Sequence, residues 1–430
     1  MLGAFVSAFK VPDLRRKLLF TFAIMALFRF GSVLPSPGVS TKAINACIAL
    51  ADANPNAAFD LVNLFSGGAL LQLSVFALGI MPYITSSIIM QLLTVVIPRL
   101  ERLKEEGDSG NQKITQYTRY LTIALAILQS TVIVSLARVP GQLFQGCSEE
   151  LIPDESTLRI ATIVMTMTAG TAVIMWLGEL ITDRGIGNGM SLLIFMSIAS
   201  QLPNQGTSIY QATNLFVFGL VLLLGLLIVV GVIFVEQSQR RIPVQYAKRN
   251  IGRRQYGGTQ TYIPMKVNQA GVIPVIFASS LLYLQQLLSQ VWDNTRLTTF
   301  VNDVFVPSNP LYGIFYTVLI IFFAYFYTAI TFNTVEISDN MRKYGGFIPG
   351  IRPGRPTAEY LDYILNRITL PGALFLAAIT VLPFLLLGLT NQQEFPFGGT
   401  SVLIMVGVGL ETVKQIESQL MMRNYEGFLR

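Results

Sequence analysis

Ionisable side chains are rare inside the long apolar stretches of this 430-residue chain, and they limit the chemistry that it could perform. The main ones are Arg29, Glu179 and Glu411. Charged groups at membrane depth usually serve a proton relay, an ion path or a substrate site. An intramembrane enzyme would need paired groups such as two Asp, Ser with Lys, or His with Glu. We find no such constellation and expect no catalytic site.

Metal and nucleotide chemistry have little support in the sequence. The chain contains no His and only two Cys, Cys47 and Cys147, which excludes a Cys-based metal cluster. No G-x-x-x-x-G-K-[ST] phosphate loop occurs. The stretch GIGNG at 185–189 follows an apolar helix rather than a strand, so it predicts a tight turn. We expect no cofactor, and any nucleotide-driven step must come from a partner.

The composition is that of a polytopic membrane protein: 52% of the residues are hydrophobic, 13% are charged and the mean hydropathy is +0.56. A membrane-spanning helix needs about 20 mainly apolar residues. Ten ranges qualify, the fifth being short: roughly 18–34, 74–97, 117–137, 158–181, 189–203, 214–235, 269–291, 311–332, 358–386 and 400–421.

Lys and Arg concentrate at both ends of the chain and in every second loop between these predicted spans. The alternate loops hold only Lys42, Arg138, Arg159 and Arg296. Because basic loops stay on the cytoplasmic side, both termini are expected to be cytoplasmic. Cys47 and Cys147 would then lie outside, where an oxidising exterior could join them in a disulfide. Their separation in space is not given by the sequence.

Two short patterns recur in the two halves of the chain. G-x-x-P-x-I occurs at 79–84 and 271–276, and G-x-S-x-L-I occurs at 189–194 and 399–404. The second predicted span therefore matches the seventh, and the fifth matches the tenth. Because each half holds five spans, the second half must be inverted relative to the first. We expect halves at 1–205 and 206–430, with the functional site at their interface near the bilayer midplane.

The repeat places aliphatic residues at equivalent positions: Ile84, Ile194, Ile276 and Ile404. Ile80 and Met190 each lie one helical turn from one of them. Such a set would form an apolar collar that excludes water and ions yet yields around a chain of any sequence. The alternatives are ordinary helix packing and an inverted-repeat secondary transporter. A transporter would place polar groups at the midplane, which the collar does not offer.

Sequence blocks along the whole chain resemble the SecY family, the central subunit of the bacterial protein-conducting channel. They are FSGGAL with FALGIMPYI, GIGNGMS, FVEQSQRRIPVQYAKR, VNQAGVIPVIFASS, FIPGIRPGRPT and FGGTSVLI. The resemblance implies an all-α polytopic fold of ten helices, in two five-helix halves around a central pore. It also implies a multi-pass protein of the bacterial plasma membrane that conducts unfolded preproteins and releases apolar segments laterally into lipid.

The resemblance assigns roles to two sets of residues. The pore ring consists of Ile80, Ile84, Met190, Ile194, Ile276 and Ile404, with Met190 standing where branched aliphatics are typical. Residues from about 61 to 71 match a half-helix that closes the pore as a plug, including Leu61, Leu64, Phe65, Ser66, Gly67, Gly68 and Leu70. The two glycines permit a flexible joint. A re-entrant loop with a purely structural role is the alternative.

The resemblance further implies a lateral gate between the second and seventh spans. Pro82 and Pro274 would weaken the helical hydrogen bonding of these walls. Gln91 and Asn268 could hydrogen-bond across the closed gate, or each could be satisfied within its own helix end.

Two basic loops, at 236–268 and 333–357, complete the expected site. The first is a hairpin, and Pro349, Pro353 and Pro356 stiffen the second. Rigid guanidinium groups suit carboxylates or RNA phosphates. The resemblance implies docking of the ribosome and the SecA motor here, and partnership with SecE and SecG. The partner-binding residues would be Arg240, Arg241, Lys248, Arg253, Arg254, Arg352 and Arg355. The alternative is that membrane topology alone requires these charges.

Overall fold

The structure is a computed structural model of the chain. It describes residues 9–51, 66–139, 147, 149–154, 156–212, 215–246, 249–251, 254–256, 260–291, 310–390 and 399–427.

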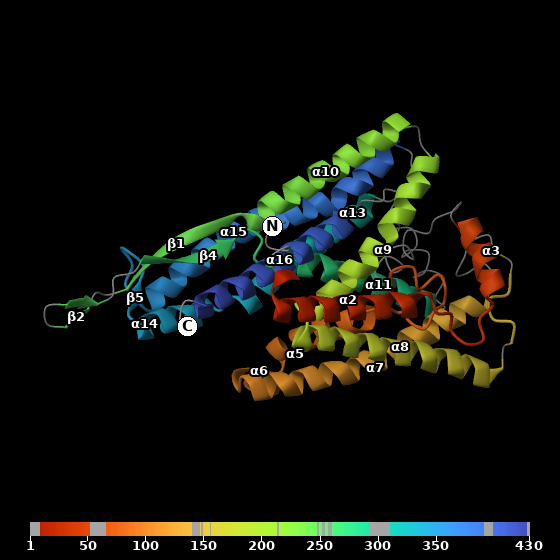
Figure 1. The fold of residues 1–430 in the computed structure, drawn as a ribbon, viewed down its shortest axis with the longest axis horizontal. Helices are drawn as coiled ribbons and strands as arrows, with labels where there is room; N and C mark the ends of the chain where they lie inside the picture. Colours follow the sequence, from red (N-terminus) through yellow and green to blue (C-terminus); the bar gives the residue numbers. More distant parts are fainter. Residues whose placement is uncertain are drawn as a thin grey trace.

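Two sets of helices make up the body (Figure 1). The helices of the first half are α2 (Pro12–Val33), α3 (Thr41–Ala51), α5 (Met81–Val96), α6 (Pro98–Glu105), α7 (Asp108–Arg138), α8 (Thr157–Arg184) and α9 (Gly189–Ala212). Those of the second half are α10 (Leu215–Gln237), α11 (Ile273–Val291), α13 (Pro310–Thr331), α14 (Thr334–Lys343), α15 (Arg355–Thr390) and α16 (Gly399–Gly427).

A helix overlaps each of the ten predicted spans. Within the described residues, five helices are long and apolar enough to cross a membrane, and α5 with α6 adds a sixth candidate, bent by 99°. Two predicted ranges need correction. The second span starts at Met81 rather than at residue 74, because the backbone turns at Leu73 and Gly79, which both have positive φ. The helix of the fifth span extends past the predicted end at residue 203, since α9 runs for 24 residues.

The helices matched by the sequence repeat meet in space. The second predicted span, α5, packs against the seventh, α11, and the fifth, α9, packs against the tenth, α16. Within each half, neighbouring helices pack in a series, such as α5 on α7 and α7 on α8. The contacts between the halves therefore include both pairs that the repeated motifs selected.

An antiparallel ribbon of strands projects from one end of the body (Figure 1). Strand β1 (Gln239–Tyr246) pairs with β4 (Gln260–Lys266) and with the short β5 (Gly346–Phe347). Two further strands, β2 (Arg249–Ile251) and β3 (Arg254–Tyr256), pair with each other. The predicted hairpin is thus confirmed, and it adds a strand element to a fold that is otherwise α-helical. A small apolar cluster that includes Ile242 and Leu361 joins the ribbon to α15.

The opposite end of the body carries a disulfide between Cys47, on α3, and Cys147. Their Cα atoms lie 5.4 Å apart and both residues are buried. The backbone N–H of Ser40 also donates to the carbonyl of Leu151, at 3.0 Å. The pairing that the sequence left open is therefore confirmed. We call this end the disulfide end, and we call the end with the strand ribbon and α14 the basic end.

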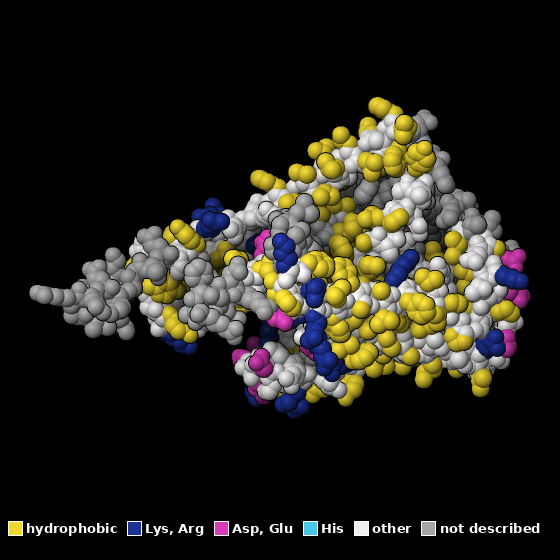
Figure 2. Space-filling view, viewed as in Figure 1, with side chains coloured by type: hydrophobic (Ala, Val, Ile, Leu, Met, Phe, Trp, Pro, Cys, Tyr) yellow, Lys and Arg dark blue, Asp and Glu magenta, His cyan; other side chains and the backbone are white. Residues whose placement is uncertain are grey.

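The outer surface of the body suits a lipid environment. Figure 2 shows hydrophobic side chains covering much of one face of the helices, with Lys and Arg gathered mainly toward the basic end. Many large apolar side chains are exposed, including Leu27, Leu223 and Phe322. A soluble protein rarely exposes so large an apolar surface.

Candidate functional site

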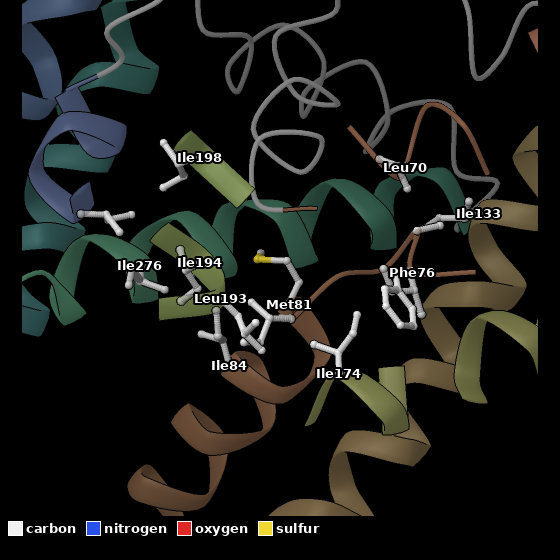
Figure 3. Packing of buried hydrophobic residues seen from close by; sticks show 14 of the residues in the cluster. Leu70, Phe76, Met81, Ile84, Ile133, Ile174, Leu193, Ile194, Ile198 and Ile276 are labelled. Atoms are coloured by element: carbon white, nitrogen blue, oxygen red, sulfur yellow. The ribbon is translucent and has the colours of Figure 1, made fainter. Parts of the chain in front are cut away.

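The six residues predicted as a collar belong to one large apolar cluster in the body. Ile80, Ile84, Ile194, Ile276 and Ile404 are buried, and Met190 is half-buried and packs against the same cluster. Figure 3 shows Ile84, Ile194 and Ile276 close to one another, from α5, α9 and α11. The residues therefore point into the protein and not toward lipid. Their role as a pore ring stays a prediction.

Equivalent residues of the collar occupy equivalent places in their helices. Ile84 is the fourth residue of α5 and Ile276 the fourth of α11. Ile194 is the sixth residue of α9 and Ile404 the sixth of α16. The backbone N–H of Ile84 donates to the carbonyl of Ile80 at 3.1 Å, so these two residues are one turn apart, as expected. The collar thus lies in the first turns of four helices, two from each half.

A largely buried stretch of mainly turns, residues 66–80, precedes α5, and we call it the pre-α5 segment. It is bound to the disulfide end by two backbone hydrogen bonds, Ser36 N–H to Leu73 O at 3.1 Å and Val75 N–H to Leu34 O at 2.9 Å. The predicted plug residues Ser66, Gly67, Gly68 and Leu70 lie at its start. Ser66 is helical and turns follow from Gly67, while residues 61–65 of the predicted half-helix lie outside the described residues. The other three, Leu61, Leu64 and Phe65, lie outside the described residues.

The start of this segment lies against α9 beyond the collar. A Cβ added to Gly67 would lie 3.3 Å from the Cα of Ser197, and one added to Gly68 would lie 2.6 Å from Nε2 of Gln201. Both contacts are on α9, one to two turns beyond Ile194 in the direction of the disulfide end. At 1.5 Å per residue this is an axial shift of roughly 5–10 Å. The pre-α5 segment and the collar therefore lie at successive turns of the same helix, α9.

Pro82 and Pro274 do not weaken the helices that carry them, and the sequence-based argument was wrong here. Each is the second residue of its helix, α5 or α11. A proline in the first turn lacks an N–H that would have no intrahelical acceptor anyway, and its fixed φ suits the helix. The two prolines therefore define where the walls begin. The walls themselves contact each other, and the lateral gate stays a prediction.

Gln91 and Asn268 are not joined by any hydrogen bond in the part of the chain that the structure describes. The Asn268 amide instead donates to Oε1 of Glu236 at 2.7 Å and to the carbonyl of Gly271 at 3.1 Å. The bond across the gate is thus replaced by a buried hydrogen bond between the connection before α11 and the end of α10. Glu236 stands in the block FVEQSQRRIP, but nothing in its spacing indicated Asn268 as its partner.

The isolated charges noted in the sequence have distinct surroundings. Glu179 accepts two hydrogen bonds from Arg119, both at 2.8 Å, in a bidentate pair that joins α7 to α8. Glu411 is exposed. Arg29 donates to a backbone carbonyl of the pre-α5 segment. No group of three or more His, Cys, Asp or Glu that could hold a metal ion occurs among the described residues.

The predicted partner-binding residues lie at the basic end where the structure describes them. Arg240, Arg241, Arg352 and Arg355 are exposed. Arg355 pairs with Glu359 at 3.0 Å, and the backbone carbonyl of Arg352 accepts from Thr357 Oγ1 at 2.9 Å. Lys248 and Arg253 lie outside the described residues, and Arg254 is described only as backbone of β3.

Comparisons with known proteins agree on one family. The family model described as SecY matches residues 74–413. A protein of Streptomyces scabiei named "Protein translocase subunit SecY" is 61% identical over 439 residues, covering all of both chains. A solved structure described as "The plug domain of the SecY protein stablizes the closed state of the translocation channel and maintains a membrane seal" aligns with a TM-score of 0.62 and 18% identity, over 94% of this chain and 91% of that one.

A second solved structure, "Sec61 in the Canine ribosome-channel complex from the endoplasmic reticulum", aligns with a TM-score of 0.60 and 16% identity, again over 94% and 91% of the two chains. At these identities the two structures establish the fold. Identity over the full length of the Streptomyces protein establishes descent as well. The chain belongs to the SecY family.

Proposed function

We propose that the chain is the pore-forming subunit of a Sec translocon, which conducts unfolded preproteins across the bacterial plasma membrane and releases apolar segments into lipid. The observation that carries this function is the collar: four helices, two from each half, place apolar residues of equivalent position in one buried cluster. Such a constriction contains no group that would select a particular solute. The full-length relative is named as a protein translocase subunit.

The pre-α5 segment is proposed as the described part of the plug. It is buried and stacked beyond the collar on the disulfide end, where a movable stopper would close the path of an exported chain. The contact of α5 with α11 is proposed as the closed lateral gate, because both helices contribute to the collar and belong to different halves. Parting them would open a path from the collar to lipid.

Crosslinking of a stalled secretory chain tests this function. A photoreactive side chain placed at Ile84, Ile194 or Ile276 is expected to crosslink to the chain in transit, because a conducted polypeptide must contact its narrowest passage. Leu223, which is 62% exposed on α10, is the matched control and should give no crosslink before the substrate enters lipid. Equal yields at the collar and at Leu223 would show that substrate does not pass through the collar.

The proposed orientation places the basic end in the cytoplasm and the disulfide end outside. Charge supports it, because cytoplasmic loops are enriched in Lys and Arg. The disulfide supports it independently, because disulfides persist in oxidising compartments such as the exterior. Both termini are then cytoplasmic. The proposed partners are SecE and SecG within the membrane, and SecA and the ribosome at the basic end. We assign no catalytic step to the chain itself.

Reversing the charge of Arg352 tests docking and orientation together. Arg352→Glu is expected to weaken binding of SecA by at least about tenfold, because like charges would replace a favourable contact. Lys42→Glu, exposed on α3 at the disulfide end, is the control and should leave binding unchanged. Binding is measured on vesicles of both orientations. Binding of SecA to the disulfide end, or equal binding by the two variants, would contradict the proposed docking site and orientation.

A further inference from the structure

Arg29 makes an unusual contact for a basic residue near the C-terminal end of an apolar helix, α2. Its Nη1 atom donates to the backbone carbonyl of Gly67 at 2.7 Å and to Oγ of Ser200 at 3.3 Å. One guanidinium thus joins three parts of the first half: α2, the start of the pre-α5 segment, and α9. The Ser200 hydroxyl in turn donates to the carbonyl of Ser197 at 2.8 Å, which fixes its orientation.

The backbone at Gly67 and Gly68, which accepts this hydrogen bond, packs closely against α9. Gly67 and Gly68 both adopt left-handed backbone angles, with φ of 68° and 88°. A Cβ added to Gly68 would lie 2.6 Å from Nε2 of Gln201, so the end of that side chain would have to move. Ser66, Ala69 and Leu70 around them are fully buried, and Ser66 Oγ accepts from the backbone N–H of Leu70 at 3.1 Å. Arg29 therefore binds a stretch of this segment whose paired glycines have the conformational freedom to act as a joint.

The described hydrogen-bond acceptors of the Arg29 guanidinium are these two oxygens. No carboxylate lies within salt-bridge distance of it among the residues that the structure describes. A guanidinium in an apolar environment is costly unless hydrogen bonds satisfy it, and hydrogen bonds from a charged donor are stronger than neutral ones. The Gly67 carbonyl thus stabilises Arg29. By the same interaction, Arg29 stabilises the position of Gly67.

We propose that Arg29 is a positioning residue that holds the pre-α5 segment in its closed place, with Ser200 as its second anchor. This role rests on the proposed function of that segment as a plug. Movement of the segment away from α9 would remove the Gly67 carbonyl from Arg29. The closed state is therefore favoured by a charged hydrogen bond that the open state lacks. Loss of such a bond shifts an equilibrium by about 10- to 100-fold.

The test measures where the segment lies as well as whether the channel leaks. Leu70→Cys is introduced as a labelling site, and the native cysteines do not compete because they are paired. A membrane-impermeant maleimide added from the disulfide end reports exposure of the segment, and ion flux into proteoliposomes reports the seal. Arg29→Met is expected to raise both rates about tenfold or more. Arg29→Lys keeps a charged donor and should raise them less.

Two comparisons make the result specific. Arg16→Met removes an exposed charge from the same helix and should change neither rate. Ser200→Ala should raise labelling modestly, because it removes the second anchor. If Arg29→Met does not fold, as judged by loss of the disulfide between Cys47 and Cys147, the Arg29→Lys and Ser200→Ala variants decide the question. Unchanged labelling in every folded variant overturns the proposal.

Deletion of residues 66–70 separates this proposal from the plug itself. If the deletion raises ion flux while Arg29→Met changes neither rate, the segment is a plug that Arg29 does not hold. If the deletion leaves ion flux unchanged, the plug assignment is wrong. In that case, labelling of Leu70→Cys in the undeleted chain still shows whether Arg29 fixes the segment. If Arg29→Met leaves the labelling rate unchanged, the positioning role is rejected as well.

Discussion

Asparagine at Ile84 and Ile276 is expected to raise both the ion leak of the resting channel and the export of preproteins with weak signal sequences. The two residues occupy the same place in α5 and α11, and both are buried in the shared apolar cluster. A dry apolar constriction blocks ions because water is unstable within it. An amide buried there without a partner costs about 1–3 kcal/mol, so two amides favour a wetted or opened state. The leak should rise about tenfold or more.

Enhanced export distinguishes this effect from simple loss of structure, because a misfolded channel would lose export. Leu281→Asn on α11 is the matched control: it introduces the same amide on the same helix at a side chain that is 44% exposed. Flux is measured in proteoliposomes, and export of a weak-signal substrate is measured in cells. If neither quantity changes in the double variant, these residues are ordinary packing and the collar is misassigned.

Much of the collar could be predicted from the sequence because the repeated motifs carry positional information. Each isoleucine follows, at the same sequence separation, a glycine that begins or precedes a helix. Equivalent motifs therefore place their isoleucines at equivalent positions along their helices. Gly189 and Gly399 begin α9 and α16. Gly79 and Gly271, both with positive φ, precede α5 and α11. The repeat therefore predicted which residues match, and the structure shows in addition that the helices carrying them contact each other between the halves.

The two prolines show how a misplaced helix boundary leads to a wrong expectation about helix stability. The predicted second span extended through residues 74–97 because hydropathy does not distinguish buried turns from helix. With that boundary, Pro82 lay inside a helix and was expected to disrupt it. In the structure the helix starts at Met81, so the same proline stabilises a helix start. Element boundaries depend on backbone angles at residues such as Leu73, which composition does not reveal.

Contacts between distant segments were beyond the reach of sequence reasoning. The bond of Asn268 to Glu236 depends on how α10 and the connection before α11 are placed in three dimensions. The bond from Arg29 to Ser200 joins residues 171 positions apart. The disulfide was foreseen as a possibility from topology alone, because both cysteines were assigned to the same side of the membrane. The pairing itself required the fold to bring their Cα atoms within bonding range.

Alanine at Gly170 is expected to displace the pre-α5 segment from its place on α8. A Cβ at this position would overlap the carbonyl oxygen of Val75 and lie 3.2 Å from Cδ1 of Phe76. The obstacle is backbone that is itself bound to Leu34 on the other side, so it cannot yield freely. Overpacking of this kind typically costs about 1–3 kcal/mol. The melting temperature of the purified protein should fall, and ion leak should rise.

Gly313→Ala on α13 provides the matched control, because nothing lies within 4 Å of a Cβ added there. Alanine favours a helix over glycine by about 0.5–1 kcal/mol, so this variant should be as stable as the parent or more so. The same chemical change thus has opposite expected effects at two helix positions. Only contact with the pre-α5 segment distinguishes them. Equal melting temperatures and equal leak for the two variants would mean that Gly170 does not support this segment, and that the seal does not depend on its close packing against α8.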